Sequence, residues 1–497
     1  MASSRGPRVV VVGAGFGGLG VAAELLRAGC GDVMVLEQAD EVGGVWRANT
    51  YPAAACDAPS SLYSWSWAPN PRWGHRYARQ PEILDYLHRT AAEAGVLDRV
   101  RTGVEVTGAA YDEGAGTWTV RTGAGEEITA DVLVPALGQL HRPVVPDLPG
   151  VDSFAGTAFH SARWDHGHDL AGRRVAVVGA GASAIQFVPA IVGTVSELTV
   201  FQRSAPYVLP KPDRAYTAVH RRAFDRFPRS QRFGRRLTWE ISELFNGSLV
   251  TGGNALDRVL LAAWRMQLRR QVRDPELRRR LEPDYPLGCK RLLFGNDWYP
   301  ALARDHVSVV TDAIAGVEPR GVRTIDGTLH EVDTIIWGTG FAATEFLAPL
   351  RVTGVGGTEV HDVWADGAQA HLGMTVPGFP NLFLVYGPHT NLGGSSIIGM
   401  LEAQARYVAQ AVRAVADGAR LDVRRDVAER FDDEMQERGR GTVWAACASW
   451  YRGPGGRVVT NWPGLVQEYV DRTARLDPDH FEPAGTGLTS TAPSTHR

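Results

Sequence analysis

Two glycine-rich turns, each directly after a run of β-branched residues, constrain the fold of this chain most. The first reads Gly13-Ala-Gly15-Phe-Gly-Gly18 after Val9–Val12, and the second reads Gly179-Ala-Gly181-Ala-Ser183-Ala184 after Arg174–Val178. In a dinucleotide-binding unit such glycines allow a tight turn, close approach of a pyrophosphate and close helix–strand packing. The sequence therefore predicts an α/β fold with two Rossmann-like dinucleotide-binding domains.

An acidic residue completes the first nucleotide site. A helix is expected over residues 19–28, with its N-terminal NH groups facing the phosphates, and a second strand over Val33–Leu36 ends at Glu37. This acid follows the turn by roughly 20 residues, the spacing at which a carboxylate binds the ribose hydroxyls of an adenosine. The combination favours nucleotide binding over a chance glycine-rich turn.

The second site differs at the corresponding position. The strand expected over residues 198–201 is followed by Gln202, Arg203 and Ser204, without an acid. A carboxylate there would repel a 2′-phosphate, whereas an arginine binds one in a fork. The second site is therefore predicted to prefer NADP(H) to NAD(H); the alternative is that Arg203 is a solvated surface arginine.

An aromatic stretch follows the first site, over residues 43–46, 49–52, 56–57 and 61–63. A rigid loop packed on a flat ring system would have this composition, and an aromatic-rich surface loop is the alternative. A turn rich in glycine and hydroxyl residues, 387–396, precedes a helix expected over 400–415. Such a turn before a helix N-terminus offers a second place for a flavin.

The remaining pattern divides the chain into discontinuous domains. Further strands are expected near 104–106, 118–120 and 130–134 as a small meander, and at 292–294, 307–311, 334–337 and 381–386; a helix is expected over 81–95. Residues 211–288 are rich in Arg and Leu, with breaks at Pro228, Gly252-Gly253 and Pro275. The predicted division is 1–145 with 370–475 for the first nucleotide domain, 146–210 with 290–369 for the second, 211–289 as a helical insertion and 476–497 as a disordered tail.

Charge and cysteine content give no indication of a nucleic-acid partner, a membrane partner or a metal site. The formal net charge of −3 gives no reason to expect a nucleic-acid or membrane partner, and the arginines of the insertion are interpreted as a solvated face because acids are interleaved. Cys30, Cys56, Cys289 and Cys447 form no CxxC pair and no metal-ligand spacing. They are interpreted as reduced thiols of a cytoplasmic protein without a metal site. The N-terminus lacks the apolar region of a signal peptide, and no apolar stretch reaches the roughly 18–20 residues of a membrane span.

Two motifs give the chain a family resemblance from about residue 8 to 472. Phe154, Gly156, His160, Trp164 and Asp165 form the pattern F-x-G-x-x-x-H-x-x-x-W-D just before the second glycine turn. The chain thereby resembles the type I Baeyer–Villiger monooxygenases. A second motif of that family is matched by Gly43, Gly44, Trp46, Tyr51, Pro52 and Asp57, with a departure at Ala53, where glycine or methionine is usual.

The resemblance implies FAD in the first site and NADPH in the second. In such enzymes NADPH reduces the flavin, O₂ adds to give a C4a-peroxide, and the peroxide converts a ketone into an ester or lactone. Arg291 matches the active-site arginine, and Asp57 matches the carboxylate that orients it. Lys290, Arg203 and neighbouring Ser204 match the 2′-phosphate site, and Trp450 resembles a tryptophan near the nicotinamide nucleotide. The expected cofactor-binding residues are Gly13, Gly15, Gly18, Glu37, Val45, Trp46, Asp57, Tyr63, Val106, Gly179, Gly181, Ser183, Arg203, Ser204, Lys290 and Trp450.

Several questions stay open at this point. The relatives that make sulfoxides or N-oxides, and a flavin reductase that does not transfer oxygen, share both nucleotide sites. His160 is expected to hold hydrogen bonds in an interdomain linker and not to transfer protons. The substrate pocket is expected to be lined by the helical insertion, by residues near 341–346 and by the aromatic region 444–451. The identity of the ketone and the oligomeric state are left undetermined.

Overall fold

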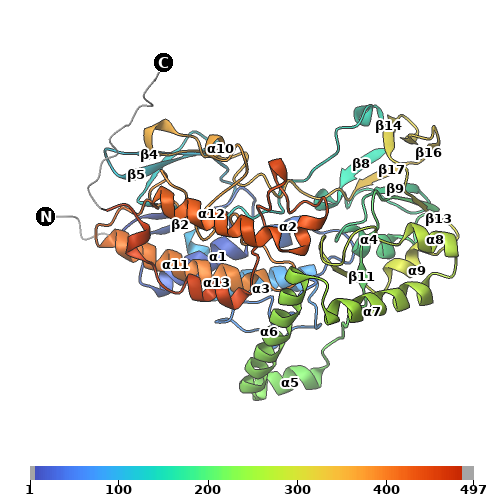
Figure 1. Cartoon of the computed structure of the whole chain (residues 1–497), viewed down its shortest axis with the longest axis horizontal. Coiled ribbons are helices and arrows are strands. Elements are labelled where there is room, and N and C mark those ends of the chain that lie inside the picture. The colour runs from blue at the N-terminus through green and yellow to red at the C-terminus, as the bar shows by residue number, and fades with distance from the viewer. Residues whose placement is uncertain (1–5, 484–497) are drawn as a thin grey trace.

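Two parallel sheets, one in each half of the molecule, carry the two glycine-rich turns (Figure 1). The structure is a computed structural model that describes residues 6–483. The first sheet has the strand order β3-β2-β1-β7, and the second has the order β13-β10-β9-β17-β8. Their strands are β1 (Val9–Val12), β2 (Val33–Leu36), β3 (Val100–Arg101), β7 (Val132–Pro135), β8 (Thr157–His160), β9 (Arg174–Val178), β10 (Glu197–Phe201), β13 (Val307–Val310) and β17 (Thr334–Trp337).

Each glycine turn follows an interior strand of its sheet. The four valines of β1 are at most 5% exposed, because β1 is hydrogen-bonded on both sides and covered on both faces. The strand β9 is likewise flanked by β10 and β17. The predicted α/β fold with two Rossmann-like units is therefore confirmed.

Helices from distant parts of the chain cover the first sheet. Helix α1 (Phe16–Arg27) packs against α11 (Ile397–Ala416), which in turn packs against α13 (Val466–Arg472). The remaining helices of this half are α2 (Val45–Ala48), α3 (Gln80–Glu93), α10 (Val360–Val363) and α12 (Arg425–Arg440). The C-terminal segment thus completes the unit that the N-terminal strands begin.

Smaller sheets extend both units. The predicted meander is present as β4 (Val106–Asp112), β5 (Thr117–Thr122) and β6 (Glu127–Ala130), antiparallel to one another, before β7 returns to the main sheet. Strand β18 (Arg351–Thr353) adds to it beside β4. The second unit carries the meander β14 (Ile314–Glu318), β15 (Gly321–Thr324) and β16 (Leu329–Glu331), and a short pair of β11 (Val208–Leu209) with β12 (Leu293–Phe294).

Residues 381–386 do not form the strand that the sequence predicts. The segment is buried beside β7, but only Leu382 makes a β-bridge, with Leu133. Asn381 and Tyr386, at its two ends, have φ of 55° and 63°. These left-handed conformations bend the chain away from a regular ladder, although its apolar composition is that of a buried strand.

The insertion between β11 and β12 is helical, as predicted. It contains α5 (Ala218–Arg226), α6 (Pro228–Thr251), α7 (Ala255–Gln271) and α8 (Pro275–Arg280), and α9 (Trp298–Leu302) follows β12. Proline begins α6 and α8, and Gly252 ends α6, so the breaks fall at the expected residues. Helix α4 (Ala184–Ile191) follows the second glycine turn and packs against α9.

The prediction of four reduced thiols is wrong for two of them. Cys289 and Cys447 form a disulfide with a Cα–Cα distance of 6.1 Å, whereas Cys30 and Cys56 are free. The two partners are 158 residues apart in sequence. Sequence spacing carries no sign of such a pairing, because it depends on how the insertion and the C-terminal segment pack.

The C-terminal prediction is wrong for residues 476–483. This part contains the 3₁₀ turn Pro478–His480, and Phe481 is 4% exposed. Residues 484–497, also assigned to a disordered tail, lie outside the described residues. Over residues 6–483, no helix is both long and apolar enough to cross a membrane.

Candidate active site

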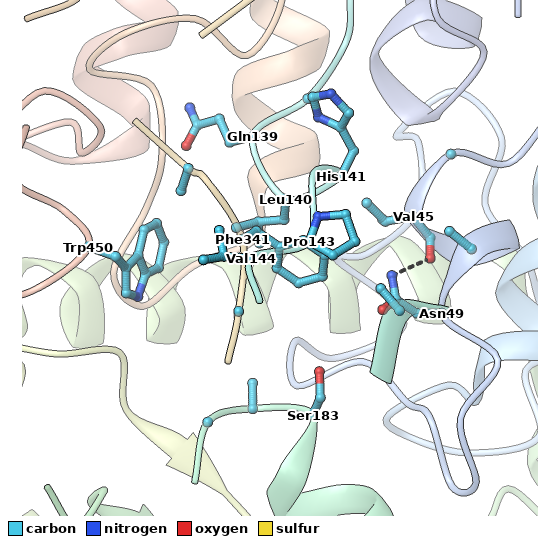
Figure 2. Close-up of a pocket in the computed structure, with 18 of the residues that line it drawn as sticks. Val45, Asn49, Gln139, Leu140, His141, Pro143, Val144, Ser183, Phe341 and Trp450 are labelled. Atoms are coloured by element: carbon cyan, nitrogen blue, oxygen red, sulfur yellow. Dashed lines mark hydrogen bonds between the residues drawn. The ribbon is translucent and has the colours of Figure 1, made fainter. Parts of the chain in front are cut away.

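One large cavity connects the two glycine turns. It has a volume of about 1630 Å³ and is lined by both turns, the aromatic loop after β2, and residues near Trp450. Figure 2 shows Val45 with Asn49, Ser183 and Trp450 around Pro143, Val144 and Phe341. Pockets for one small ligand measure about 300–1,000 Å³, so this cavity has room for more than one ligand.

The glycine turns have the shape of two pyrophosphate cradles. Gly13 and Gly179 have φ of +103° and +110°, and a Cβ on either would collide with a backbone carbonyl, that of Ala136 or Gly338. A Cβ on Gly181 would stand in open space at the cavity wall. The turns thus leave room for phosphates to meet backbone NH groups, so these residues fit two dinucleotides.

Two other predicted residues of the turns have different surroundings. Gly18 does not border the cavity, and a Cβ there would collide with the carbonyl of Gly13, so this glycine serves close helix packing. Ser183, at the N-cap position of α4, lines the cavity.

Glu37 lies at the edge of the cavity beside the first cradle. Its carboxylate accepts hydrogen bonds from Ala14 N at 2.7 Å and from Ala39 N at 2.9 Å. These bonds fix the carboxylate at the edge of the cavity, which Glu37 and Val106 both line. The position is the one in which a carboxylate meets ribose hydroxyls.

The aromatic loop forms one wall of the cavity. Trp46 donates its ring NH to Tyr63 OH at 3.0 Å, and the two rings meet edge to face with centroids 5.5 Å apart. Val45, Trp46 and Tyr63 all line the cavity. A wall stiffened in this way suits a flat ring system, and the alternative of an aromatic surface loop does not hold.

Arg291 and Asp57 form a two-pronged ion pair at this cavity. Arg291 Nη2 lies 2.8 and 2.7 Å from the two carboxylate oxygens, and Nε lies 3.1 Å from Oδ2. Burial alone would raise the pKa of Asp57, but the guanidinium holds that pKa below its usual range. The pair fixes a permanent positive charge at the cavity wall, where it can stabilise an anion.

Lys211 adds a second cation beside the pair. Its ammonium group donates a hydrogen bond to the carbonyl of Cys56 at 3.0 Å. Burial lowers the pKa of Lys211, while the carboxylate of Asp57 opposes that shift. Lys211 also helps to hold the pKa of Asp57 down, after Arg291. One carboxylate therefore faces two cations.

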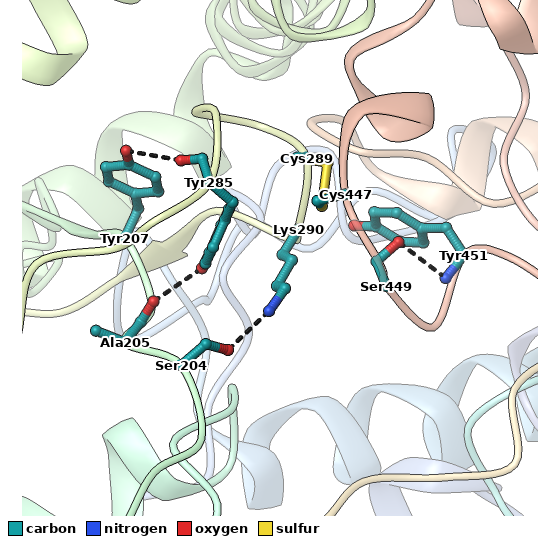
Figure 3. The surroundings of a disulfide bond; sticks show 9 residues. All are labelled: Ser204, Ala205, Tyr207, Tyr285, Cys289, Lys290, Cys447, Ser449 and Tyr451. Carbon is teal, nitrogen blue, oxygen red and sulfur yellow. Dashed lines mark hydrogen bonds between the residues drawn. A yellow bond between two sulfur atoms is a disulfide. The ribbon is translucent and has the colours of Figure 1, made fainter. Parts of the chain in front are cut away.

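The predicted 2′-phosphate residues lie together at the cavity wall. Lys290 Nζ donates to Ser204 Oγ at 2.7 Å (Figure 3), and Arg203 lines the same cavity with its side chain exposed. Burial and then the charge of Arg203 lower the pKa of Lys290. The two cations repel each other, and a dianionic phosphate bound between them would reduce this repulsion.

The disulfide ties this cluster to the segment that carries Trp450. Cys289 directly precedes Lys290 (Figure 3), and Cys447 lies three residues before Trp450, which lines the cavity. The rings of Trp450 and Tyr451 lie 4.3 Å apart between centroids, and Tyr451 is 1% exposed. A covalent link thus fixes two parts of the cavity wall to each other.

The expected contribution of the helical insertion to the pocket is wrong in large part. Phe341, Ala343 and Trp450 line the cavity as predicted, but among residues 211–289 only Tyr285 does so. Helices α5 and α6 project from the body of the molecule, whereas α7 packs along the second unit beside β11 and α9 (Figure 1). The sequence of these helices does not show which of their apolar side chains would face a ligand.

Within residues 6–483, His160 makes hydrogen bonds only to backbone groups. Its Nε2 lies 3.1 Å from the carbonyl of Gly340, and Nδ1 accepts from Ala162 N at 3.1 Å. Burial lowers its pKa, which favours the neutral ring. Gly340 belongs to the turn through which the chain leaves the second sheet, so the bonding role expected for His160 agrees with these contacts.

Sequence reasoning missed several residues at the cavity. Gln186 in α4 exchanges two hydrogen bonds of 3.0 Å with the backbone of Ala55, which joins the second unit to the aromatic loop. Tyr386 donates to Asn391 at 2.7 Å. Ser395 Oγ is buried without a hydrogen-bond partner in the described part of the chain. Of these residues, only Ser395 lies in a segment that the sequence had singled out, the hydroxyl-rich turn before α11.

The chain is similar in sequence to a known protein family and to characterised relatives. The pyridine nucleotide-disulphide oxidoreductase family matches residues 7–226. A Baeyer-Villiger monooxygenase of Streptomyces coelicolor is 43% identical over 475 residues, covering 95% of this chain and 91% of the relative.

Solved structures resemble the whole fold. A steroid monooxygenase bound to NADP has a TM-score of 0.84 at 31% identity, with 94% of this chain and 97% of that one covered. The structure of OTEMO in complex with FAD and NADP has a TM-score of 0.84 at 27% identity, with 95% and 98% covered.

Proposed function

The chain belongs to the Baeyer–Villiger monooxygenases, and from this membership we propose which residues of the cavity perform the reaction. The enzyme depends on FAD, consumes NADPH and O₂, and inserts one oxygen atom next to a ketone carbonyl to give an ester or lactone. When bound, FAD supplies the redox chemistry, which takes up a hydride and activates O₂. The family membership favours this activity over sulfoxide or N-oxide formation and over a reductase without oxygen transfer.

FAD is proposed to lie in the first cradle and NADPH in the second. Glu37 would hold the adenosine ribose of FAD, and Val45, Trp46, Tyr63 and Val106 would border the flavin. Arg203, Lys290 and Ser204 would hold the 2′-phosphate of NADPH, and Trp450 would cover its nicotinamide. The corresponding domains are proposed as 1–145 with 370–475 and 146–210 with 290–369, and support comes from the strand order of the two parallel sheets. The exception is β18 with α10, which pack with the first unit and so belong to the first domain.

Arg291 is proposed as the catalytic residue. The observation that carries this role is its two-pronged pair with Asp57 at the cavity wall, with an Nη2–Oδ2 distance of 2.7 Å. Oxygen insertion places negative charge first on the activated oxygen and then on the former carbonyl oxygen. A fixed guanidinium stabilises both charges without reorganising, and Asp57 keeps it in orientation.

The apolar lining around Pro143, Phe341 and Leu392 is proposed to receive the ketone. An apolar wall excludes water, and exclusion of water strengthens the attraction between Arg291 and the developing oxyanion. The carbonyl group would be the one polar part of the substrate that Arg291 can reach.

The test uses the FAD-loaded enzyme, NADPH and isotopically labelled O₂ with a panel of ketones and sulfides. We expect labelled esters or lactones from the wild type. Arg291→Ala should still oxidise NADPH but form ester about 100-fold more slowly, the usual cost of losing one electrostatic donor to an oxyanion.

Arg163→Ala is the matched control, because Arg163 also lines the cavity but makes no pair with Asp57. Ester formation should survive this change. Full ester yield from Arg291→Ala would remove the proposed role of Arg291, and labelled sulfoxides without any ester would favour heteroatom oxygenation.

A further inference from the structure

The solvent-facing side of helix α6 is apolar. Phe233, Leu237, Ile241 and Leu244 are between 52% and 72% exposed, and their spacing places them on one face of the helix. The opposite face carries the buried residues of α6, Glu243, Asn246, Leu249 and Val250. The helix therefore has one face in the protein and a second apolar face in solvent, which an ordinary surface helix lacks.

Neighbouring segments of the insertion also expose apolar side chains. Val219 in α5, Phe227 between α5 and α6, and Val259 and Met266 in α7 are each at least 60% exposed. We call the eight side chains the insertion face: Val219, Phe227, Phe233, Leu237, Ile241, Leu244, Val259 and Met266. Of thirteen exposed large hydrophobic residues in the described part of the chain, these eight come from the segment that runs from α5 to α7. Helices α5 and α6 project from the body of the molecule (Figure 1).

The same helices carry a strong positive charge that the net charge of the chain conceals. Residues 218–271 contain eleven arginines and four acids, a surplus of seven, although the whole chain has a net charge of −3. Glu243 and Asp257, two of the four acids, are buried. Arg229, Arg232 and Arg236 are exposed on α6 next to the apolar side chains. The surface is thus apolar in the middle and cationic at its border.

An apolar surface bordered by arginines favours an anionic lipid surface over a second copy of the chain as the partner. In a symmetric contact with a second copy, the arginines of both copies would approach one another, and like charges repel. An anionic lipid surface has the complementary chemistry, because phosphates pair with arginines and the acyl boundary accepts aromatic and aliphatic side chains. A helix that lies in the plane of the interface also needs no membrane-spanning length.

We propose that the insertion face binds the surface of an anionic lipid bilayer. The eight apolar side chains enter the headgroup boundary, and the exposed arginines of α5–α7, such as Arg229, Arg232 and Arg236, contact lipid phosphates. The cavity opens elsewhere, since of the insertion only Tyr285 lines it, so bound lipid does not block cofactors. Apolar ketones dissolve in lipid, and an enzyme held at the bilayer meets them where they are concentrated.

Sedimentation with vesicles tests the proposal on the full-length, FAD-loaded protein. We expect binding to vesicles of phosphatidylcholine mixed with phosphatidylglycerol, weaker binding at high salt, and little binding to phosphatidylcholine alone. The triple variant Arg229→Gln, Arg232→Gln, Arg236→Gln should bind at least about tenfold more weakly, since each arginine near an anionic surface contributes about fivefold. The triple variant Phe233→Ser, Ile241→Ser, Leu244→Ser should lose binding to a similar extent.

Ile325→Ser is the matched control, because Ile325 is 69% exposed but lies in the turn after β15, outside the insertion. It should bind vesicles like the wild type. Flavin content and the thermal unfolding temperature check that the variants fold; if a triple variant lost its flavin, Phe233→Ser and Arg232→Gln would be measured singly.

Two results would overturn the proposal. One is absence of binding at low salt, or equal binding to both kinds of vesicle. The other is a wild-type dimer that Phe233→Ser converts to monomer while vesicle binding stays unchanged, which would make the insertion face a contact between copies.

Discussion

Gln202 stands in the second nucleotide site at the position that Glu37 holds in the first, and the cation Arg203 follows it. Arg203 is exposed at the cavity, and its charge helps to lower the pKa of nearby Lys290. Both features are typical of a site with excess positive charge, which a bound anion would neutralise. The sequence contained this information, because the sign of one side chain after a strand does not depend on long-range packing.

We expect Arg203→Glu to weaken NADPH far more than NADH. The new carboxylate would repel the 2′-phosphate and remove a charged hydrogen bond, which costs about 1.5–3 kcal/mol, or roughly 10–100-fold in affinity. The measurement is the KM of both nucleotides, with Arg163→Glu as the control for an added charge in the cavity. Equal losses for NADPH and NADH would mean that Arg203 has a structural role only.

The Arg291–Asp57 pair marks the limit of sequence reasoning at the residue scale. The two residues are 234 positions apart, and no periodicity relates them. Their pairing came from the family resemblance, and the two-pronged geometry agrees with it. Lys211 and Gln186, which lie beside the pair and beside Ala55, belong to no motif, so their place depends on how α4 and the segment after β11 pack against the aromatic loop.

Among the elements, the strands and helices next to the glycine turns were the most predictable. The strands β1, β2, β9 and β17 have the predicted bounds, because continuous runs of branched residues suit a strand covered on both faces. The segment 381–386 has the same kind of composition but bends at Asn381 and Tyr386. Composition predicts burial well, whereas backbone conformation at single residues depends on what surrounds them.

The disulfide connects two elements that border the cavity, and its removal should affect both stability and NADPH binding. A link across 158 residues lowers the conformational entropy of the unfolded chain. In the loop-entropy description this raises the free energy of the unfolded state by about 4–5 kcal/mol. We expect Cys447→Ser, or reduction by a dithiol, to lower the free energy of unfolding by about 2–4 kcal/mol. It should also raise the KM for NADPH, because Lys290 and Trp450 lie on the two linked segments.

Denaturant unfolding with and without a dithiol measures this effect. The dithiol should not change the stability of Cys447→Ser any further, and Cys30→Ser provides a thiol control that leaves the disulfide intact. A titration that finds four free thiols in the untreated protein would contradict the disulfide.

At the scale of the whole molecule, the two units meet around a cavity of about 1630 Å³. Its walls come from segments as distant in sequence as Gly13 and Trp450. A ligand that fills such a cavity binds only the folded protein, and it stabilises that state according to its concentration and affinity.

Removal of FAD should therefore destabilise the protein. At a ligand concentration 100 times the Kd, a single site contributes about 2.7 kcal/mol. Calorimetry should show a lower unfolding temperature for the FAD-free protein, full recovery on reloading with FAD, and no recovery with riboflavin, which lacks the pyrophosphate that the first cradle binds. An unchanged unfolding temperature would mean that the first cradle does not carry FAD.

The sequence by itself determined the α/β fold, the two nucleotide sites and their different ligands. These features depend on local properties: which glycines permit a turn, which runs of residues suit a buried strand, and which charge follows a strand. Only the tertiary structure decided the Cys289–Cys447 link, the bend of residues 381–386 and the direction of the helical insertion away from the cavity. Each of these depends on contacts between residues far apart in the chain, and packing in three dimensions sets such contacts.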